Sequence, residues 1–143
     1  MKKIFSLLLF LLYVQSVGAI VQLGEVYDNS VRFFVYDDGT ASIFDGKPLK
    51  LGSSGVYTVP RTVKYQNKDY TVTSILSYAF TSFYYNTDAN LTLRVLNIPN
   101  TVEEIGDLAF TGCKNLVEVN LDDNMPLKSI GNQVFNETGI TSF

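Results

Sequence analysis

Apolar residues recur along this chain in the spaced pattern L-x-x-L-x-L, in which x is any residue. Leu93–Ile98 carries the pattern, Leu116–Leu121 repeats it 23 residues later, and Ile140–Phe143 begins it again after a further 24 residues. The alternation in the second half of each motif is that of a short strand with one buried face. The pattern therefore predicts similar strands at a fixed interval, as in a repeat protein.

A second apolar pattern is interleaved with the first: an isoleucine is followed five residues later by a phenylalanine that has alanine or valine before it. The three pairs are Ile75 with Phe80, Ile105 with Phe110, and Ile130 with Phe135. Two patterns that stay in register along one chain are not expected of an ordinary α+β domain. They indicate one repeating unit.

A period of 23–24 residues with this motif is typical of a leucine-rich-repeat solenoid. We expect each coil to contribute a short strand, so that Leu96 and Ile98 stack on Val119 and Leu121 of the next coil. The isoleucine and Ala-Phe positions are expected on the opposite wall, on a short helical or 3₁₀ turn. The expected fold class is an α+β repeat, and its stability depends on stacking between neighbouring coils.

One repeat is longer than the others. Phe80 and Leu93 are 13 residues apart, whereas Phe110 and Leu116 are six apart. An insertion of about seven residues is therefore centred on residues 81–90, and insertions in solenoids map to loops. The segment contains three adjacent aromatic residues, Phe83, Tyr84 and Tyr85.

The repeat becomes irregular towards the N-terminus, where turn signals favour β-hairpins. Val31–Tyr36 and Thr40–Phe44 flank Asp38-Gly39, a strong hairpin signal. A second hairpin is expected to turn at Asn67-Lys68. We therefore divide the mature chain into a β-rich N-terminal cap, residues 20–71, and leucine-rich repeats, residues 72–143, with two full repeats and a partial third.

The first 19 residues are expected to be a signal peptide. Lys2-Lys3 precedes an apolar run from Ile4 to Val14, and the small residues Val17-Gly18-Ala19 suit a cleavage site. The run is shorter than the roughly 20 residues of a membrane span, and no later stretch is long and apolar enough for one. Losing two lysines changes the net charge from −3 to −5, which argues against nucleic acid as a partner.

The composition argues against an enzyme. The chain has no histidine, which excludes histidine-based triads and histidine-ligated zinc. The adjacent carboxylates are expected to be solvated turn residues, and we expect no catalytic, metal or cofactor-binding residue. The single cysteine, Cys113, excludes an internal disulfide. It is interpreted as a buried thiol, with an intermolecular disulfide as the alternative.

The segment from Ile98 to Leu116 carries the most specific motif, IPNTVEEIG followed by AFTGCKNL. It resembles the BspA-type leucine-rich repeat, whose pattern is roughly I-P-x-x-V-x-x-I-G-x-x-A-F-x-x-C-x-x-L. The resemblance covers about residues 55–143, with Leu76 in place of the usual glycine and Val134 in place of alanine. It implies a secreted or cell-surface protein that binds extracellular-matrix or cell-surface proteins in adhesion.

The outward strand positions are the candidate partner-binding residues, because solenoids commonly bind through the sheet face. They are Arg94, Val95, Asn97, Glu118, Asn120 and Ser142. Asn97 and Asn120 occupy the same slot and are expected to form an amide ladder. Phe83, Tyr84 and Tyr85 are further candidates, since aromatic residues in loops concentrate interface energy. A carbohydrate-binding module that uses Tyr84 and Tyr85 is the alternative function, and a carboxylate-dependent hydrolase is a third hypothesis that no residue pair supports.

The third copy of the motif reaches only Phe143. A coil without a neighbour exposes its apolar stacking face and an unpaired strand edge. We therefore expect residues 1–143 either to be a truncated piece of a longer repeat array or to self-associate, end to end, through this uncapped repeat.

Overall fold

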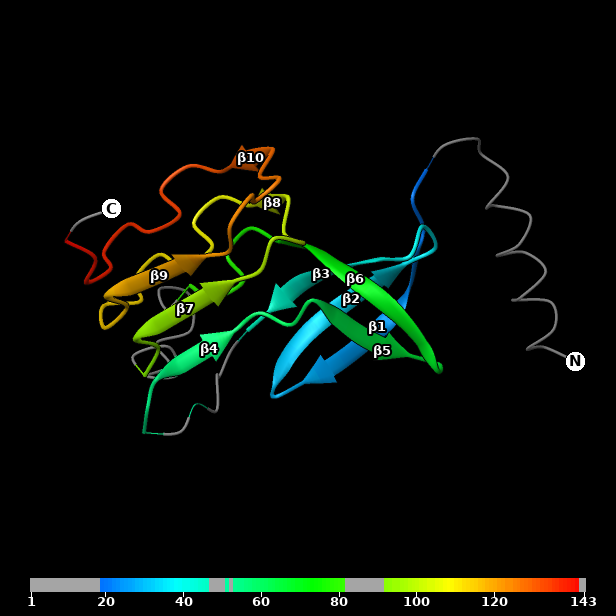
Figure 1. Cartoon of the computed structure of the whole chain (residues 1–143), viewed down its shortest axis with the longest axis horizontal. Helices are drawn as coiled ribbons and strands as arrows, with labels where there is room; N and C mark the ends of the chain where they lie inside the picture. The colour runs from blue at the N-terminus through cyan, green and yellow to red at the C-terminus, as the bar shows by residue number, and fades with distance from the viewer. Residues whose placement is uncertain (1–18, 47–50, 52, 82–91, 142–143) are drawn as a thin grey trace, which may run out of the picture.

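The computed structural model describes residues 19–46, 51, 53–81 and 92–141. These residues form two sheets (Figure 1), one of order β1-β2-β3-β6-β8-β10 with β5 beside β6, and one of order β4-β7-β9. The strands are β1 (Gln22–Asp28), β2 (Val31–Tyr36), β3 (Thr40–Asp45), β4 (Val56–Thr58), β5 (Thr62–Tyr65), β6 (Lys68–Ile75), β7 (Val95–Ile98), β8 (Glu104–Ile105), β9 (Glu118–Leu121) and β10 (Ser129–Ile130).

The N-terminal strands β1, β2 and β3 form an antiparallel meander. Val31, Phe33 and Val35 of β2 are fully buried and alternate with half-buried neighbours, as expected of a strand with one face in the core. The hairpin predicted at Asp38-Gly39 is confirmed, and Gly39 has a φ of 87°. Glycine suits this position because it adopts positive φ without steric cost.

The second predicted hairpin is also present, but its turn lies one residue earlier than expected. Gln66 and Asn67 have φ values of 48° and 62°, while Lys68 already pairs with Tyr65. Positive φ at both central residues is the geometry of a tight two-residue hairpin. The strand that follows, β6, spans Lys68–Ile75 and so runs across residues 71 and 72, the expected boundary between cap and repeats.

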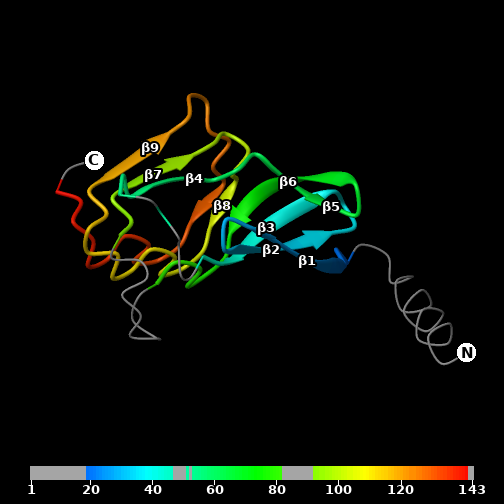
Figure 2. The ribbon, with the colours of Figure 1, turned by 90° about the horizontal axis from the view of Figure 1, so that it is seen from below.

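The sheet β4-β7-β9 forms one wall of the solenoid, with its strands side by side in Figure 2. All its strands are parallel, and Leu96 lies opposite Val119 as Ile98 lies opposite Leu121. The predicted register of the repeats is therefore confirmed. Tyr57 of β4 lies opposite Leu96, so the coil pattern starts upstream of β6.

The opposite wall differs from the expectation. Ile75, Ile105 and Ile130 end the strands β6, β8 and β10, which pair in parallel, rather than lying on helical turns. The third residue after each isoleucine has positive φ: Tyr78 at 64°, Leu108 at 57° and Gln133 at 52°.

A left-handed residue at this point interrupts a helical run. Thr111 therefore closes only a single turn, donating from its main-chain N–H to the carbonyl of Leu108 at 3.2 Å. The Ala-Phe segments are turns, and the helical part of the predicted α+β class is not found in the described residues.

The core between the walls is a stack of aromatic rings continued by aliphatic side chains. Phe80 and Phe110 are fully buried, with parallel rings 4.9 Å apart. Phe135 continues the stack at 5.6 Å from Phe110. Backbone bonds hold the same coils together, since the N–H of Phe110 donates to the carbonyl of Val134 at 2.9 Å. The repeated Ala/Val-Phe positions thus form a continuous core.

Glycine lets adjacent coils approach closely beside the isoleucine strands. A Cβ atom on Gly106 would lie 2.4 Å from the main-chain nitrogen of Ser77, and one on Gly131 would lie 2.4 Å from that of Asp107. Both glycines follow the isoleucine of their coil. Their conformation is ordinary, and contact between neighbouring backbones is what requires glycine there.

The last described coil leaves its apolar side chains exposed. Leu121 and Ile130 are 54% and 55% exposed, whereas the equivalent Ile98 and Ile105 are 1% and 3% exposed. The edges of β9 and β10 have no neighbour among the described strands. This coil lies at the opposite end of the molecule from the meander of β1, β2 and β3 (Figure 1).

Candidate functional site

The outward face of β4, β7 and β9 carries the side chains that alternate with the buried ones. Val95 lies between Val56 and Glu118 in one cross-strand row. Asn97 lies between Thr58 and Asn120 in the next row. We call this set of side chains the outer strand face. It consists of Val56, Thr58, Arg94, Val95, Asn97, Glu118 and Asn120.

The second row is a continuous hydrogen-bonded ladder. The side-chain amide of Asn97 donates to the hydroxyl of Thr58 at 2.9 Å, and that of Asn120 donates to the amide oxygen of Asn97 at 3.0 Å. Asn120 also donates to the carboxylate of Glu118 at 2.8 Å. The predicted amide ladder is confirmed, and it extends one strand further than expected, to Thr58. Each member is held in one orientation by its neighbour.

Arg94 precedes β7 and is exposed beside Gly55. Its main-chain N–H donates to the carbonyl of Gly55 at 2.8 Å, and a Cβ on Gly55 would lie 2.8 Å from Cγ of Arg94. The absence of a side chain on Gly55 therefore leaves room for the arginine stem.

Five of the candidate residues lie on this one face. They are Arg94, Val95, Asn97, Glu118 and Asn120. Ser142 and the three aromatic residues Phe83, Tyr84 and Tyr85 lie outside the described residues.

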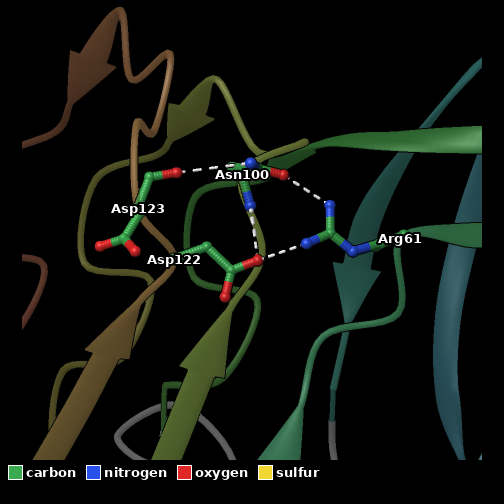
Figure 3. A network of polar contacts seen from close by, with 4 residues as sticks. All are labelled: Arg61, Asn100, Asp122 and Asp123. Atoms are coloured by element: carbon green, nitrogen blue, oxygen red, sulfur yellow. Dashed lines mark hydrogen bonds and ion pairs between the residues drawn. The ribbon is translucent and has the colours of Figure 1, made fainter.

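A polar network closes the carboxyl end of the same wall (Figure 3). Arg61 donates to Asp122 and to the amide oxygen of Asn100, and the side-chain amide of Asn100 donates to the main-chain oxygen of Asp123 at 3.4 Å. The three connections that follow β4, β7 and β9 are thereby tied together. Asp122 belongs to the adjacent carboxylates that were expected to be solvated turn residues, and the structure instead pairs it with Arg61.

The adjacent carboxylates have other structural roles. Asp37 accepts the N–H of Val21 at 2.9 Å, and Asp38 accepts both the N–H and the hydroxyl of Thr40, at 2.9 Å and 2.7 Å. Lys128 pairs with Glu103, and this hydrogen bond raises the pKa of the lysine. Within the described part of the chain, no group of three histidine, cysteine or acidic side chains could hold a metal ion.

Cys113 is fully buried, and its thiol donates to the main-chain oxygen of Phe80 at 3.3 Å. The interpretation as a buried thiol is confirmed. Among the described residues, no helix has the length and apolar character needed to cross a membrane.

Parallel strands on both walls, stacked with a regular coil spacing, define a leucine-rich-repeat solenoid. Residues 81–143 match the family model of the BspA type leucine rich repeat region, so the repeats of this chain belong to that family. The resemblance read from the sequence is confirmed. No curated protein matches the chain.

Solved structures similar to this chain are bacterial leucine-rich-repeat proteins. A leucine rich cell surface protein from Faecalibacterium prausnitzii is 30% identical with a TM-score of 0.63, and the match covers 82% of this chain and 30% of that one. A leucine-rich repeat protein from Bacteroides capillosus is 22% identical with a TM-score of 0.63, covering 82% and 95%. The pneumococcal vaccine antigen PcpA is 21% identical with a TM-score of 0.61, covering 87% and 31%.

These matches differ in what they establish. The chain spans less than a third of the length of the Faecalibacterium protein. The other two matches, at 22% and 21% identity, establish the fold alone. The class of protein, a leucine-rich-repeat solenoid, follows from the family and the fold together.

Proposed function

We propose that this chain is a secreted or cell-surface adhesion protein that recognises a protein of the extracellular matrix or of another cell. The outer strand face is its binding surface. The observation that carries the proposal is the ladder from Thr58 through Asn97 to Asn120, which orders polar groups in solvent across three coils. Groups that are already ordered lose little conformational entropy on binding.

The rest of the face supplies what protein interfaces require. Arg94 is exposed and is of a residue type enriched among binding hot spots. Val56 and Val95 add apolar surface beside the polar row, and Val56 is 40% exposed. The likeness to a leucine rich cell surface protein supports a location outside the cell.

The binding surface is tested with paired variants. Residues 20–143 are applied to immobilised extracellular-matrix extract, and bound protein is quantified for the parent, for Arg94→Ala with Asn120→Ala, and for Lys64→Ala. Lys64 lies on β5, away from this face, and is exposed. We expect the double variant to lose at least tenfold in binding and the control to bind as the parent does. Equal binding by all three proteins would exclude this face. A response on a glycan array with none on matrix protein would favour the carbohydrate alternative.

Export is tested separately. N-terminal sequencing of the protein recovered from the medium or the cell surface is expected to begin at Ile20. Recovery of the chain in the cytoplasm with Met1 intact would contradict both the signal peptide and the location.

We further propose that the chain associates with itself through the last described coil. The exposed Leu121 and Ile130 support this proposal, because these positions are covered by a further coil elsewhere in the fold. Sedimentation of residues 20–143 is expected to detect dimers that dissociate in Leu121→Ser with Ile130→Ser. Val56→Ser, which also removes an exposed apolar side chain, is expected to leave them intact. A parent that stays monomeric at all concentrations would contradict self-association.

A further inference from the structure

A groove of about 450 Å³ lies on the outward side of β3, β6 and β8, on the other sheet from the outer strand face. Its volume is within the range of about 300–1,000 Å³ that is common for ligand pockets. The side chains that line it come from the start of the described chain, from β2 to β3, and from β6 to β8. They are those of Ile20, Tyr36, Asp38, Thr40, Ser42, Thr73, Ser74, Leu76, Glu103 and Glu104.

The sequence builds this groove by placing small side chains on adjacent strands. Ser42 pairs with Ser74 across β3 and β6, and Ser74 pairs with Glu104 across β6 and β8. The two serine hydroxyls are 2.6 Å apart, and Ser42 is only 5% exposed. The groove forms because these serines are short and the side chains around them are longer. The paired hydroxyl groups make the bottom of the groove polar.

The charge of the groove has one sign. Asp38, Glu103 and Glu104 line it, and no lysine or arginine does so among the described residues. Lys128 is not among the lining residues, but it pairs with Glu103, and the charge of Glu104 also acts on it. Glu104 has no ion pair with any described residue. Lys128 therefore offsets part of this charge, and a ligand that enters meets hydrogen-bond acceptors and a field that is negative on balance.

Two aliphatic side chains interrupt the polar lining of the groove. Ile20 and Leu76 lie among its lining residues, so a suitable ligand combines an apolar stem with a cationic, donor-rich head. Lysine and arginine side chains have this structure, because they bury their methylene stems and keep the charged group among polar partners. A neutral sugar would bring acceptors as well as donors and would leave the carboxylate field uncompensated.

We propose that this groove binds a lysine or arginine side chain presented by a partner protein. The stem packs between Ile20 and Leu76, and the charged head reaches Glu104 and Asp38 above the paired serines. The site is separate from the outer strand face, so the result of its test does not decide the proposed function. It adds a second contact that selects partners with a basic surface.

The test is an NMR titration of ¹⁵N-labelled residues 20–143, a segment that contains every described strand. The probe is Nα-acetyl-arginine methylamide, and the matched ligand control is Nα-acetyl-norleucine methylamide, which has an apolar stem and no charge. We expect saturable shifts of the Ser42, Ser74 and Glu104 amides with the arginine probe alone. Glu104→Gln keeps the shape of the side chain and is expected to weaken binding at least fivefold. Asp123→Asn removes one acidic charge outside the groove and is expected to bind as the parent does.

Several results would overturn the proposal. Equal shifts from the norleucine probe would show that binding depends on the apolar stem and not on the charge. Unchanged affinity in Glu104→Gln would show that this carboxylate does not contribute to binding. A chain that begins at Ile20 also carries an α-ammonium group at the wall of the groove. The titration is therefore repeated after Nα-acetylation of the protein. Binding by the acetylated form alone would assign the groove to the chain's own amino group instead of a partner.

Discussion

The central coil and the last described coil have the same sequence pattern but differ in how well they are buried. In the central coil, Ile98 and Ile105 are almost completely buried. The equivalent residues of the last coil, Leu121 and Ile130, are more than half exposed. Strand register and turn geometry are the same in both coils. The central coil has a described coil on each side, whereas the last described coil has one on a single side, and this difference explains the exposure. In this fold, the exposed fraction of a repeat side chain depends on whether a neighbouring coil covers it, and the residue type alone does not determine it.

This comparison explains how stability is distributed along the chain. Phe110 is sandwiched between the rings of Phe80 and Phe135 and is fully buried, whereas Phe135 is only half-buried. In a solenoid, each coil is stabilised mainly by its nearest neighbours. The central coil is therefore expected to be the most sensitive to substitution, and the last coil the least.

The largest expected effect is that of Phe110→Ala. Removing a fully buried phenylalanine typically costs about 3–5 kcal/mol, and Phe110 has 0% exposure. Phe135→Ala removes the same side chain from a half-buried site and should cost less than half as much. Urea denaturation of the two variants measures this difference. Equal losses would show that the last coil is packed as tightly as the central one.

A smaller effect is expected when a methyl group is added between coils. Gly106→Ala places its Cβ 2.4 Å from the backbone of the preceding coil, and overpacking of this kind costs about 1–3 kcal/mol. The contact of Gly131→Ala is equally short, but β10 is an edge strand and can move outward. In thermal denaturation, Gly106→Ala should therefore have a lower melting temperature than Gly131→Ala. The reverse order would mean that the edge coil is the more rigid.

The repeat register could be predicted from the sequence because it depends on spacing alone. The pairing of Leu96 with Val119 and the burial of Phe110 both follow from the interleaved patterns. The isoleucine wall was misread as helical. Its strands are only two residues long in β8 and β10, too short for an alternation signal, and the positive φ at Leu108 is carried by a residue type that gives no warning of it.

Other features depend on contacts that the sequence pattern does not contain. Strand β1 was not predicted, although Asp28-Asn29-Ser30 before β2 has the residue types of a turn, and Asn29 has a φ of 47°. The ladder between Asn97 and Asn120 was found because both residues occupy the same slot. The pairing of Arg61 with Asp122 was missed because these residues are 61 positions apart and occupy different slots.

The smallest effect is expected at the other end of the aromatic stack, where Tyr57 packs against Phe80 with ring centroids 5.6 Å apart. Tyr57 is only 6% exposed, and its hydroxyl has no hydrogen-bond partner among the described residues. A buried, unpaired hydroxyl is costly, so Tyr57→Phe should leave stability at neutral pH unchanged or raise it by about 1 kcal/mol.

The stabilities of the parent and of Tyr57→Phe should differ more at high pH than at neutral pH. Burial raises the pKa of Tyr57 above its ordinary value of 10.0, and the charge of Asp28 adds to the shift. Above pH 10 the unfolded chain releases this proton while the folded chain retains it, so the parent loses stability as the pH rises, by up to about 1.4 kcal/mol per pH unit. Tyr57→Phe lacks this term, and its advantage in denaturation midpoint should grow between pH 9 and pH 11, as chemical denaturation across that interval would measure. A constant difference, or a loss of stability in Tyr57→Phe at neutral pH, would show that the hydroxyl is paired or hydrated in the folded protein.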